Sequence, residues 1–128
     1  MSVERAHLIF FVADQEVSTA FHRAVLDTPP TLDVPGMTEF VLPGGNVLGL
    51  MPQANIDRLL GHAVTGLADP ASVPRAELYL VVDDPEAYLA RAIAAGAREL
   101  SPLAPRDWGH LAGYCTDPDG HVIAFART

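Results

Sequence analysis

One pattern of residues occurs twice in this chain. Residues 5–14 read RAHLIFFVAD and residues 75–84 read RAELYLVVDD, so five of the ten aligned positions are identical. A second pair follows in the same order, since PGGNVLGLM at residues 43–51 matches PDGHVIAFA at residues 118–126 at proline, glycine and valine. Two matches in the same order indicate one structural unit that is used twice.

The two copies differ at a chemically important position, because His7 in the first aligns with Glu77 in the second. The chain has 128 residues, which fits one ordinary domain. Each copy has roughly 60 residues, too few for a stable separate core. We therefore expect one domain with a shared interior, made of a module at 1–52, a link at 53–74 and a module at 75–128.

The composition excludes several classes of partner. A net charge of −8 argues against a nucleic-acid partner, which would require a basic surface. The apolar run at residues 8–13 is too short to span a membrane or to act as a signal sequence. Cys115 is the only cysteine, so no intrachain disulfide can form. We expect a cytoplasmic protein.

Hydrophobic periodicity and turn residues predict the elements of each module. Asp14 and Asp84 are predicted helix N-caps, each following an apolar strand. In the first module we expect strands at 7–13, 32–34, 37–42 and 47–51, and a helix that follows Asp14 and ends near residue 27. In the second we expect strands at 78–82, 98–101, 108–116 and 121–127, and a helix between Pro85 and Gly96. A short helix around 56–60 is predicted in the link. Both modules thus have the order βαβββ.

Four segments carry a resemblance to a known family. They are the two strand-then-aspartate openings HLIFFVAD and ELYLVVDD, the helix FHRAVL, and the ending WGHLAGYCTDPDGHVIAF. With these segments the chain resembles the glyoxalase/bleomycin-resistance/extradiol-dioxygenase superfamily, also called vicinal oxygen chelate proteins. The resemblance implies an α+β fold of two tandem βαβββ modules, whose curled mixed sheets surround a concave cleft, often in a homodimer.

The resemblance also implies where a metal would bind. Metal-using members take ligands from the first and last strands of each module. The matching first-strand positions are His7 and Glu77, which are candidate catalytic residues or metal ligands. The matching last-strand positions are Gly49 and Ala124, which have no side-chain donor. A catalytic zinc site normally keeps three protein ligands, so we predict no cofactor.

Strand alternation predicts which side chains line the cleft. His7 and Phe11 share one face of the first strand, and Glu77 and Tyr79 share one face of its counterpart. Trp108 and His110 are expected on one face of a later strand. The candidate ligand-binding residues are Phe11, Met51, Tyr79, Trp108 and His110. A pocket of this kind is apolar with a few polar groups, which suits a small molecule.

Several residues receive bland predictions. Tyr114 and Cys115 are expected in the core, and His22 is expected to be exposed without a role. Arg106 and Asp107 are expected to form an exposed ion pair. His62, in the link, is assigned no role.

The chemistry of His7 and Glu77 leaves three possibilities open: a hydrogen-bonded pair without function, a polar pair that orients a ligand or transfers a proton, and metal ligation. Two functions follow. One is a small-molecule-binding protein of the bleomycin-resistance type, without a catalytic metal. The alternative is a lyase, isomerase or dioxygenase of the glyoxalase type that uses Zn, Ni, Mn or Fe. The sequence does not decide between a binding protein and an enzyme.

Overall fold

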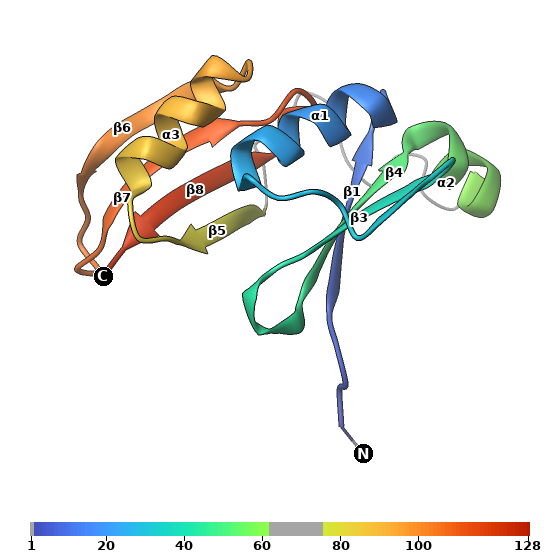
Figure 1. Ribbon diagram of the computed structural model, residues 1–128, viewed down its shortest axis with the longest axis horizontal. Coiled ribbons are helices and arrows are strands. Elements are labelled where there is room, and N and C mark those ends of the chain that lie inside the picture. Colours follow the sequence, from blue (N-terminus) through green and yellow to red (C-terminus); the bar gives the residue numbers. More distant parts are fainter. Residues whose placement is uncertain (1, 62–75) are drawn as a thin grey trace. The chain divides into compact units, whose positions relative to one another are not determined.

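The computed structural model describes residues 2–61 and 76–128 (Figure 1). The first module contains strand β1 (His7–Val12), helix α1 (Gln15–Leu26), strands β2 (Leu32–Val34), β3 (Met37–Val41) and β4 (Val47–Pro52), and a 3-10 turn η1 (Pro43–Gly45). The second contains strand β5 (Glu77–Val81), helix α3 (Pro85–Ala94) and strands β6 (Arg98–Pro105), β7 (Leu111–Thr116) and β8 (Val122–Arg127). Helix α2 (Gln53–Leu60) lies in the link, and the rest of the link, including His62, falls outside the described residues.

The chain forms two compact units. One holds β1–β4, α2 and most of α1, and the other holds β5–β8, α3 and residues 24–27 from the end of α1. Each unit has one four-stranded sheet, with the strand order β1-β4-β3-β2 in the first and β5-β8-β7-β6 in the second. The first pair in each sheet, β1·β4 and β5·β8, is parallel, and the remaining pairs are antiparallel. The predicted α+β fold with two βαβββ modules is confirmed, and His7 and Glu77 begin corresponding strands.

The predicted caps start both long helices. The Asp14 carboxylate accepts a hydrogen bond from the Val17 N–H, and the Asp84 carboxylate accepts one from the Ala87 N–H, each at 3.1 Å. These bonds satisfy N–H groups that have no partner inside the helix. Gly96 follows α3 with a φ of 109°, a left-handed conformation that glycine adopts without strain.

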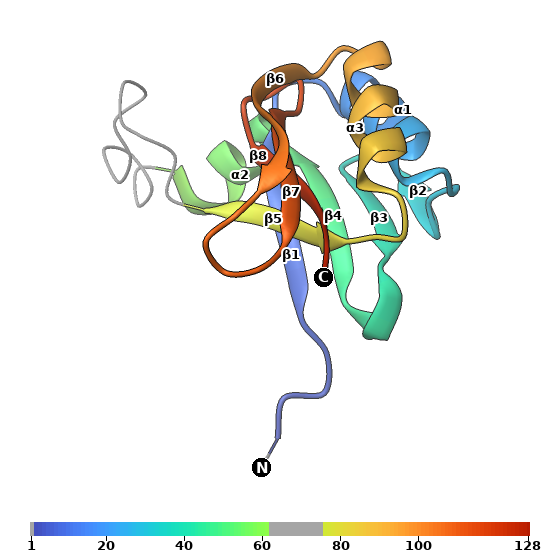
Figure 2. The ribbon, with the colours of Figure 1, turned by 90° about the vertical axis from the view of Figure 1, so that its left-hand side faces the viewer.

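Each sheet has one covered face and one face that is open along its edge strand, whereas Gly49 and Ala124 in the middle of these open faces are themselves buried. In β1 the side chain of Val12 is buried while Phe11 is 42% exposed, and in β5 Leu78 is buried while Val81 is 60% exposed. The covered face of the second sheet packs against α3, which contacts β6, β7 and β8 (Figure 2). A Cβ at Gly113 in β7 would lie 2.8 Å from the Leu89 side chain, so glycine permits this close packing.

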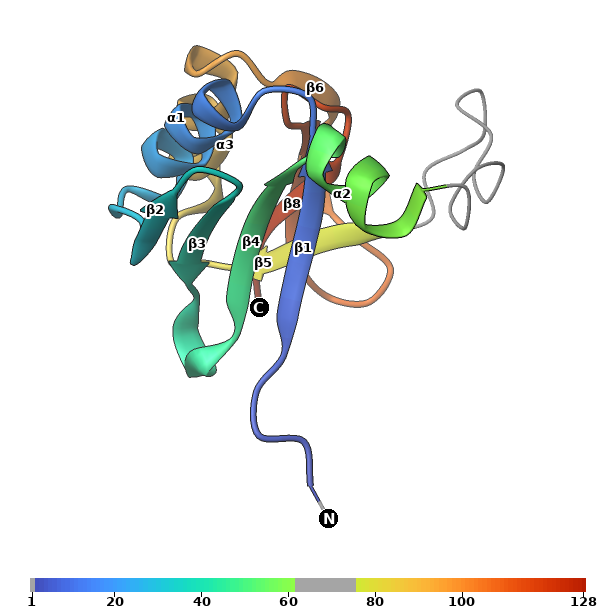
Figure 3. The same cartoon turned by 90° about the vertical axis from the view of Figure 1, so that its right-hand side faces the viewer.

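Helix α2 belongs to the first unit. It packs against β4 and β1, and Ile56 is its buried side chain (Figure 3). The helix begins at Gln53, three residues earlier than predicted from the apolar residues alone. Within the part of the chain that the structure describes, no helix is long and apolar enough to cross a membrane.

Three local predictions were wrong. Strand β6 continues through its prolines to Pro105 because it is an edge strand with two irregularities in register, where proline needs no ladder hydrogen bond. Strand β7 starts at Leu111, so Trp108 and His110 lie in the preceding turn and do not share a strand face. His22 is only 1% exposed, since its ring packs edge-on against Phe21 with centroids 5.1 Å apart.

Candidate functional site

The open faces carry equivalent rows of side chains. Residues paired directly across neighbouring strands point to the same face of a sheet. The middle row is Ile9, Gly49 and Glu39 in the first unit, and Tyr79, Ala124 and Tyr114 in the second. His7 and Glu77 lie two residues before Ile9 and Tyr79, so each lies on the same face as its row. The predicted faces of β1 and β5 agree with this arrangement.

In the first unit, His7 lies between the carboxylate of Glu39 and the guanidinium of Arg5. Its Nδ1 is 3.4 Å from an oxygen of Glu39, and the two side chains are 30% and 25% exposed. Arg5 Nε donates a hydrogen bond to His7 Nε2 at 3.1 Å. Because a guanidinium can only donate, Nε2 is the acceptor of neutral His7 and Nδ1 carries the proton that faces Glu39. Neutral His7 thus lies between the positive charge of Arg5 and the negative charge of Glu39.

Glu39 is a site residue that the sequence analysis missed. It lies in β3 between Thr38 and Phe40, both of which are fully buried. A glutamate flanked by two inward-facing residues must point to the other face of the strand, and this alternation was the available signal. The sequence could not predict that Glu39 contacts His7, because this contact depends on the pairing of β3 with β4.

Gly49 is held at its position by packing. A Cβ there would lie 3.1 Å from Ile9 Cγ1 and 3.3 Å from Met37 Sδ, closer than most real contacts. A longer side chain at this position would have to displace both neighbours. A last-strand carboxylate like that of metal-using relatives would therefore require Ile9 and Met37 to move.

In the second unit, three predicted ligand-binding residues meet. Trp108 Nε1 donates a hydrogen bond to Tyr79 Oη at 2.9 Å. Tyr79 Oη is also 2.7 Å from His110 Nδ1, and the rings of Tyr79 and His110 lie 5.9 Å apart at 33°. Trp108 and His110 thus come together through a tyrosine of β5, although they do not share a strand. Trp108 keeps 56% of its surface exposed.

Arg106 holds the turn that presents these two residues. Its guanidinium donates to the Ala112 carbonyl at 2.8 and 3.1 Å, to Ser101 Oγ at 3.0 Å and to the Pro102 carbonyl at 2.7 Å. The predicted ion pair with Asp107 was wrong, because these acceptors bind the guanidinium instead. A fixed Arg106 anchors both ends of the loop that carries Trp108 and His110.

Tyr114 stands beside a carboxylate on the same face. Burial raises the pKa of Tyr114 above its ordinary value of 10.0, Glu77 and Tyr79 raise the pKa further, and Arg106 lowers it. The Arg106 guanidinium lies 5.2 Å from the centre of the Tyr114 ring. The phenol of Tyr114 therefore stays protonated at neutral pH and can donate a hydrogen bond. Tyr114 belongs to the open face rather than to the core where it was predicted.

The remaining predicted site residues divide between the units. Phe11 and Met51 are paired neighbours on β1 and β4 of the first unit. His7 belongs to the first unit and Glu77 to the second, so their predicted pairing stays a prediction. Cys115 is fully buried as predicted, and burial together with Asp117 raises the pKa of its thiol to about 11. A thiol of this kind is unreactive at neutral pH.

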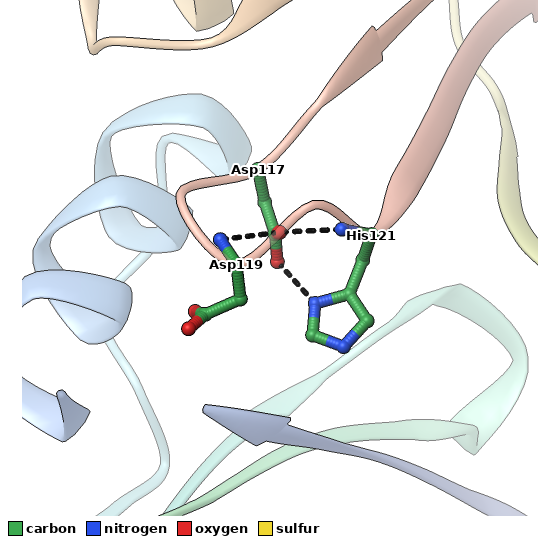
Figure 4. A group of neighbouring side chains, drawn as sticks. All are labelled: Asp117, Asp119 and His121. Atoms are coloured by element: carbon green, nitrogen blue, oxygen red, sulfur yellow. Dashed lines mark hydrogen bonds and ion pairs between the residues drawn. The ribbon is translucent and has the colours of Figure 1, made fainter. Parts of the chain in front are cut away.

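A third group of polar side chains closes the turn between β7 and β8. Asp117, Asp119 and His121 place possible ligand atoms within 4.8 Å of one another (Figure 4). The buried Asp117 carboxylate accepts hydrogen bonds from the N–H groups of Asp119 and His121 at 3.0 and 2.8 Å, and it lies 2.8 Å from His121 Nδ1. These bonds satisfy the backbone of the turn and explain the group structurally.

One concavity lies away from these faces, within the first unit. It has a volume of about 580 Å³ between α1 and β2, and is lined by Gln15, Glu16, Thr19, Ala20, Arg23, Asp33, Val34 and Pro35. The Gln15 amide spans it, donating to the Val34 carbonyl at 2.8 Å and accepting from the Gly36 N–H at 2.9 Å. None of the residues predicted for the site lines this groove.

The fold and the site define a class of protein: two βαβββ modules, each with an open sheet face that carries aromatic and acid–base side chains. Comparison with known proteins assigns the family. The model of the Glyoxalase/Bleomycin resistance protein/Dioxygenase superfamily matches residues 5–125, and the chain belongs to this superfamily. No curated protein sequence matches the chain.

Solved structures support the assignment. A glyoxalase-related enzyme from Fulvimarina pelagi is 25% identical with a TM-score of 0.81, over 96% of this chain and 86% of that one. A glyoxalase/bleomycin resistance protein from Albidiferax ferrireducens T118 is 25% identical with a TM-score of 0.73, over 96% and 97%. A family enzyme from Burkholderia phytofirmans PsJN shares the fold at 16% identity, with a TM-score of 0.81 over 95% and 96%.

Proposed function

We propose that this member of the superfamily binds a small, largely apolar molecule on the open sheet faces, without a catalytic metal. The observation that carries the proposal is the chemistry of the last strands, because Gly49 and Ala124 lie on the open faces and have no donor atom. Gly49 is flanked by Ile9 and Glu39, and Ala124 by Tyr79 and Tyr114.

The donor set around His7 does not fit a divalent ion. A metal would need the lone pair of His7 Nε2, and that lone pair accepts a hydrogen bond from the Arg5 guanidinium. A second cation beside Arg5 would also meet its positive charge. Among residues 2–61, Glu39 is the carboxylate that lies against His7, and a catalytic zinc site normally has three protein ligands.

The apolar part of the faces can supply the affinity. Ile9 and Phe11 are 37% and 42% exposed on β1, and Val81 is 60% exposed on β5. Each square ångström of apolar surface removed from water contributes about 25 cal/mol. A ligand that covers such side chains therefore gains most of its binding free energy from them, while hydrogen bonds set its orientation.

A second function is favoured by one observation. Imidazole and carboxylate are both ligands of Zn, Ni, Mn and Fe, and His7 and Glu39 lie 3.4 Å apart. A metal-dependent lyase, isomerase or dioxygenase could use His7 Nε2 as a ligand if Arg5 left it, with Glu39 orienting the ring through Nδ1–H. The substitution Arg5→Gln removes the competing cation and tests this alternative directly.

Metal analysis decides between the two functions. We expect protein purified without chelator to hold far less than one equivalent of zinc, nickel, manganese or iron. Equimolar metal, with activity lost on chelation and restored by the ion, would overturn the proposal. Ala124→Glu supplies a last-strand carboxylate and should raise metal affinity, with Ala90→Glu, on the exposed side of α3, as a control of equal charge. Ala124 is fully buried and a Cβ at Gly49 would crowd Ile9 and Met37, so circular dichroism must first show that the variant is folded.

We also propose that the protein is a two-fold homodimer. The exposed apolar side chains of both sheet faces leave surface that a second copy can cover. Light scattering at micromolar concentration should give twice the mass of 13.7 kDa. A monomer mass under these conditions would count against the proposal.

A further inference from the structure

The hydrogen-bond chain of Trp108, Tyr79 and His110 has a direction. We propose that these hydrogen bonds make His110 Nε2–H a hydrogen-bond donor. We propose further that the bound molecule is a flat, neutral aromatic carbonyl compound whose oxygen accepts from His110. The inference rests on the proposed function, since it names the class of ligand for the same face.

The direction follows from the chemistry of the three groups. Indole N–H can only donate, so Trp108 donates to Tyr79 Oη and occupies one of its lone pairs. The single proton of Tyr79 then has His110 Nδ1 within reach, at 2.7 Å. A second lone pair of Tyr79 Oη could instead accept from Nδ1–H. We infer the first arrangement, because His110 Nδ1 is the acceptor within reach of the Tyr79 proton among the described residues, and neutral His110 then carries its own proton on Nε2. His110 is half-buried, and Nε2 is the ring nitrogen outside the chain.

A second donor lies on the same face. Tyr114 occupies the row of Tyr79, with only Ala124 between them. The raised pKa of Tyr114 keeps its hydroxyl protonated, and no residue of 2–61 or 76–128 forms a hydrogen bond with that hydroxyl. Two donors on one face select a ligand with acceptor atoms rather than a ligand with donors.

The negative charge on this face further limits the class of ligand. Glu77 is close enough to Tyr114 to raise its pKa, so a negative charge already lies beside the donors. A carboxylate or phenolate ligand would be repelled by Glu77 and by the net charge of −8. A neutral carbonyl accepts the same hydrogen bonds without this repulsion. The exposed indole of Trp108 offers a flat surface on which an aromatic ring can stack.

The tautomer of His110 can be measured without any ligand. Long-range ¹H–¹⁵N correlation spectra distinguish the two nitrogens of a neutral imidazole, and His110→Gln assigns the signal among the five histidines. We expect a protonated Nε2 and an unprotonated Nδ1 above the titration range. A protonated Nδ1 would overturn the proposed direction. The single indole resonance of Trp108 should move in Tyr79→Phe, which removes its acceptor.

Three naphthalenes test the ligand class by calorimetric titration: 2-acetylnaphthalene, 2-ethylnaphthalene and 2-naphthoate. We expect the ketone to bind about tenfold more tightly than the hydrocarbon, as one hydrogen bond of about 1.4 kcal/mol would give. The carboxylate should bind more weakly than the ketone. In His110→Phe the ketone should lose its advantage while the hydrocarbon keeps its affinity. A merely structural role of His110 would weaken both equally and would overturn the inference.

Tyr88→Phe is the matched control. Tyr88 lies in α3, packs on Phe125 of β8 and on Arg91, and is not part of the hydrogen-bonded group of Trp108, Tyr79 and His110. It should leave the preference for the ketone unchanged. Equal binding of ketone and hydrocarbon by the unmodified protein would overturn this inference and leave the proposed function intact. Failure of all three compounds to bind would overturn both the ligand class and the proposed apolar site.

Discussion

The two modules share a backbone and differ in the chemistry of corresponding side chains. Where the first has Ile9, Gly49 and Glu39 across its open face, the second has Tyr79, Ala124 and Tyr114. The diagonal pair is an imidazole and a carboxylate in the first module, His7 with Glu39, and a carboxylate and a phenol in the second, Glu77 with Tyr114.

The difference shows how a repeat can acquire two kinds of binding surface. Strand pairing uses only main-chain groups, so the open face can change its side chains without changing the sheet. The first face is ionic, through Arg5, His7 and Glu39. The second is aromatic and linked by hydrogen bonds, through Tyr79 and its partners. The second face also carries the carboxylate of Glu77, so the modules differ mainly in the aromatic hydrogen-bonded group that only the second has among the described residues.

The largest expected effect tests whether the modules fold as one. Phe40 and Phe125 are fully buried, one in each module. Replacing either by alanine should cost about 3–5 kcal/mol of unfolding free energy, because it removes apolar contacts and leaves a cavity. Both substitutions should shift the same single denaturant transition, since each module is too small for a separate core. Two transitions, each responding to one substitution, would show independent domains.

The next effect is a dependence of stability on pH that arises in the core of the second module. Cys115 occupies in β7 the place that Phe40 occupies in β3, and its pKa is raised from 9.0 to about 11. The unfolded chain therefore loses the thiol proton first, and stability should fall as pH rises from about 9 to about 11. The full loss is about 2–3 kcal/mol at about 1.4 kcal/mol for each pKa unit. Urea midpoints across this range should depend less on pH in Cys115→Ala, where the raised pKa of Tyr114 leaves a remainder in the same direction. An unchanged dependence would contradict the assignment.

A smaller effect should be equal in both modules. Asp14→Ala and Asp84→Ala each remove a cap with the same 3.1 Å hydrogen bond, and each should cost about 1 kcal/mol. Asp83→Ala is the control, because Asp83 is exposed next to the cap and should change stability by less than about 0.5 kcal/mol. Thermal denaturation of the three variants measures these differences. A clearly larger loss for one cap would show that the helices are not equivalent.

The smallest effect belongs to the ionic face. A double-mutant cycle of His7→Gln and Glu39→Gln should give a coupling of about 0.2–1 kcal/mol, because both side chains are partly exposed. The coupling should change little with salt, because His7 is neutral while its Nε2 accepts from Arg5. In the second module, Glu77→Gln should instead lower the pKa of Tyr114, as seen by ultraviolet titration of the phenol. A coupling of zero at low salt would remove the ionic contrast between the modules.

Local patterns carried much of the prediction. The strand alternation that placed His7 and Phe11 on one face, and the aspartates that cap α1 and α3, depend on a few neighbouring residues. The strand of Trp108 was wrong because the Arg106 side chain folds back onto the carbonyls of Pro102 and Ala112, a contact that hydrophobic alternation does not reveal. His22 was misplaced for a similar reason, since its burial depends on aromatic neighbours.

The sequence by itself determined the repeat, the βαβββ order and the missing donors at Gly49 and Ala124, because each is a property of residue type or short-range spacing. The tertiary structure decided that Glu39 lies against His7 and that Tyr79 joins Trp108 to His110. These contacts join residues 29 to 32 positions apart, which strand register brings within hydrogen-bond reach. Register is set by the packing of whole sheets, so no residue in a pair can specify its partner alone.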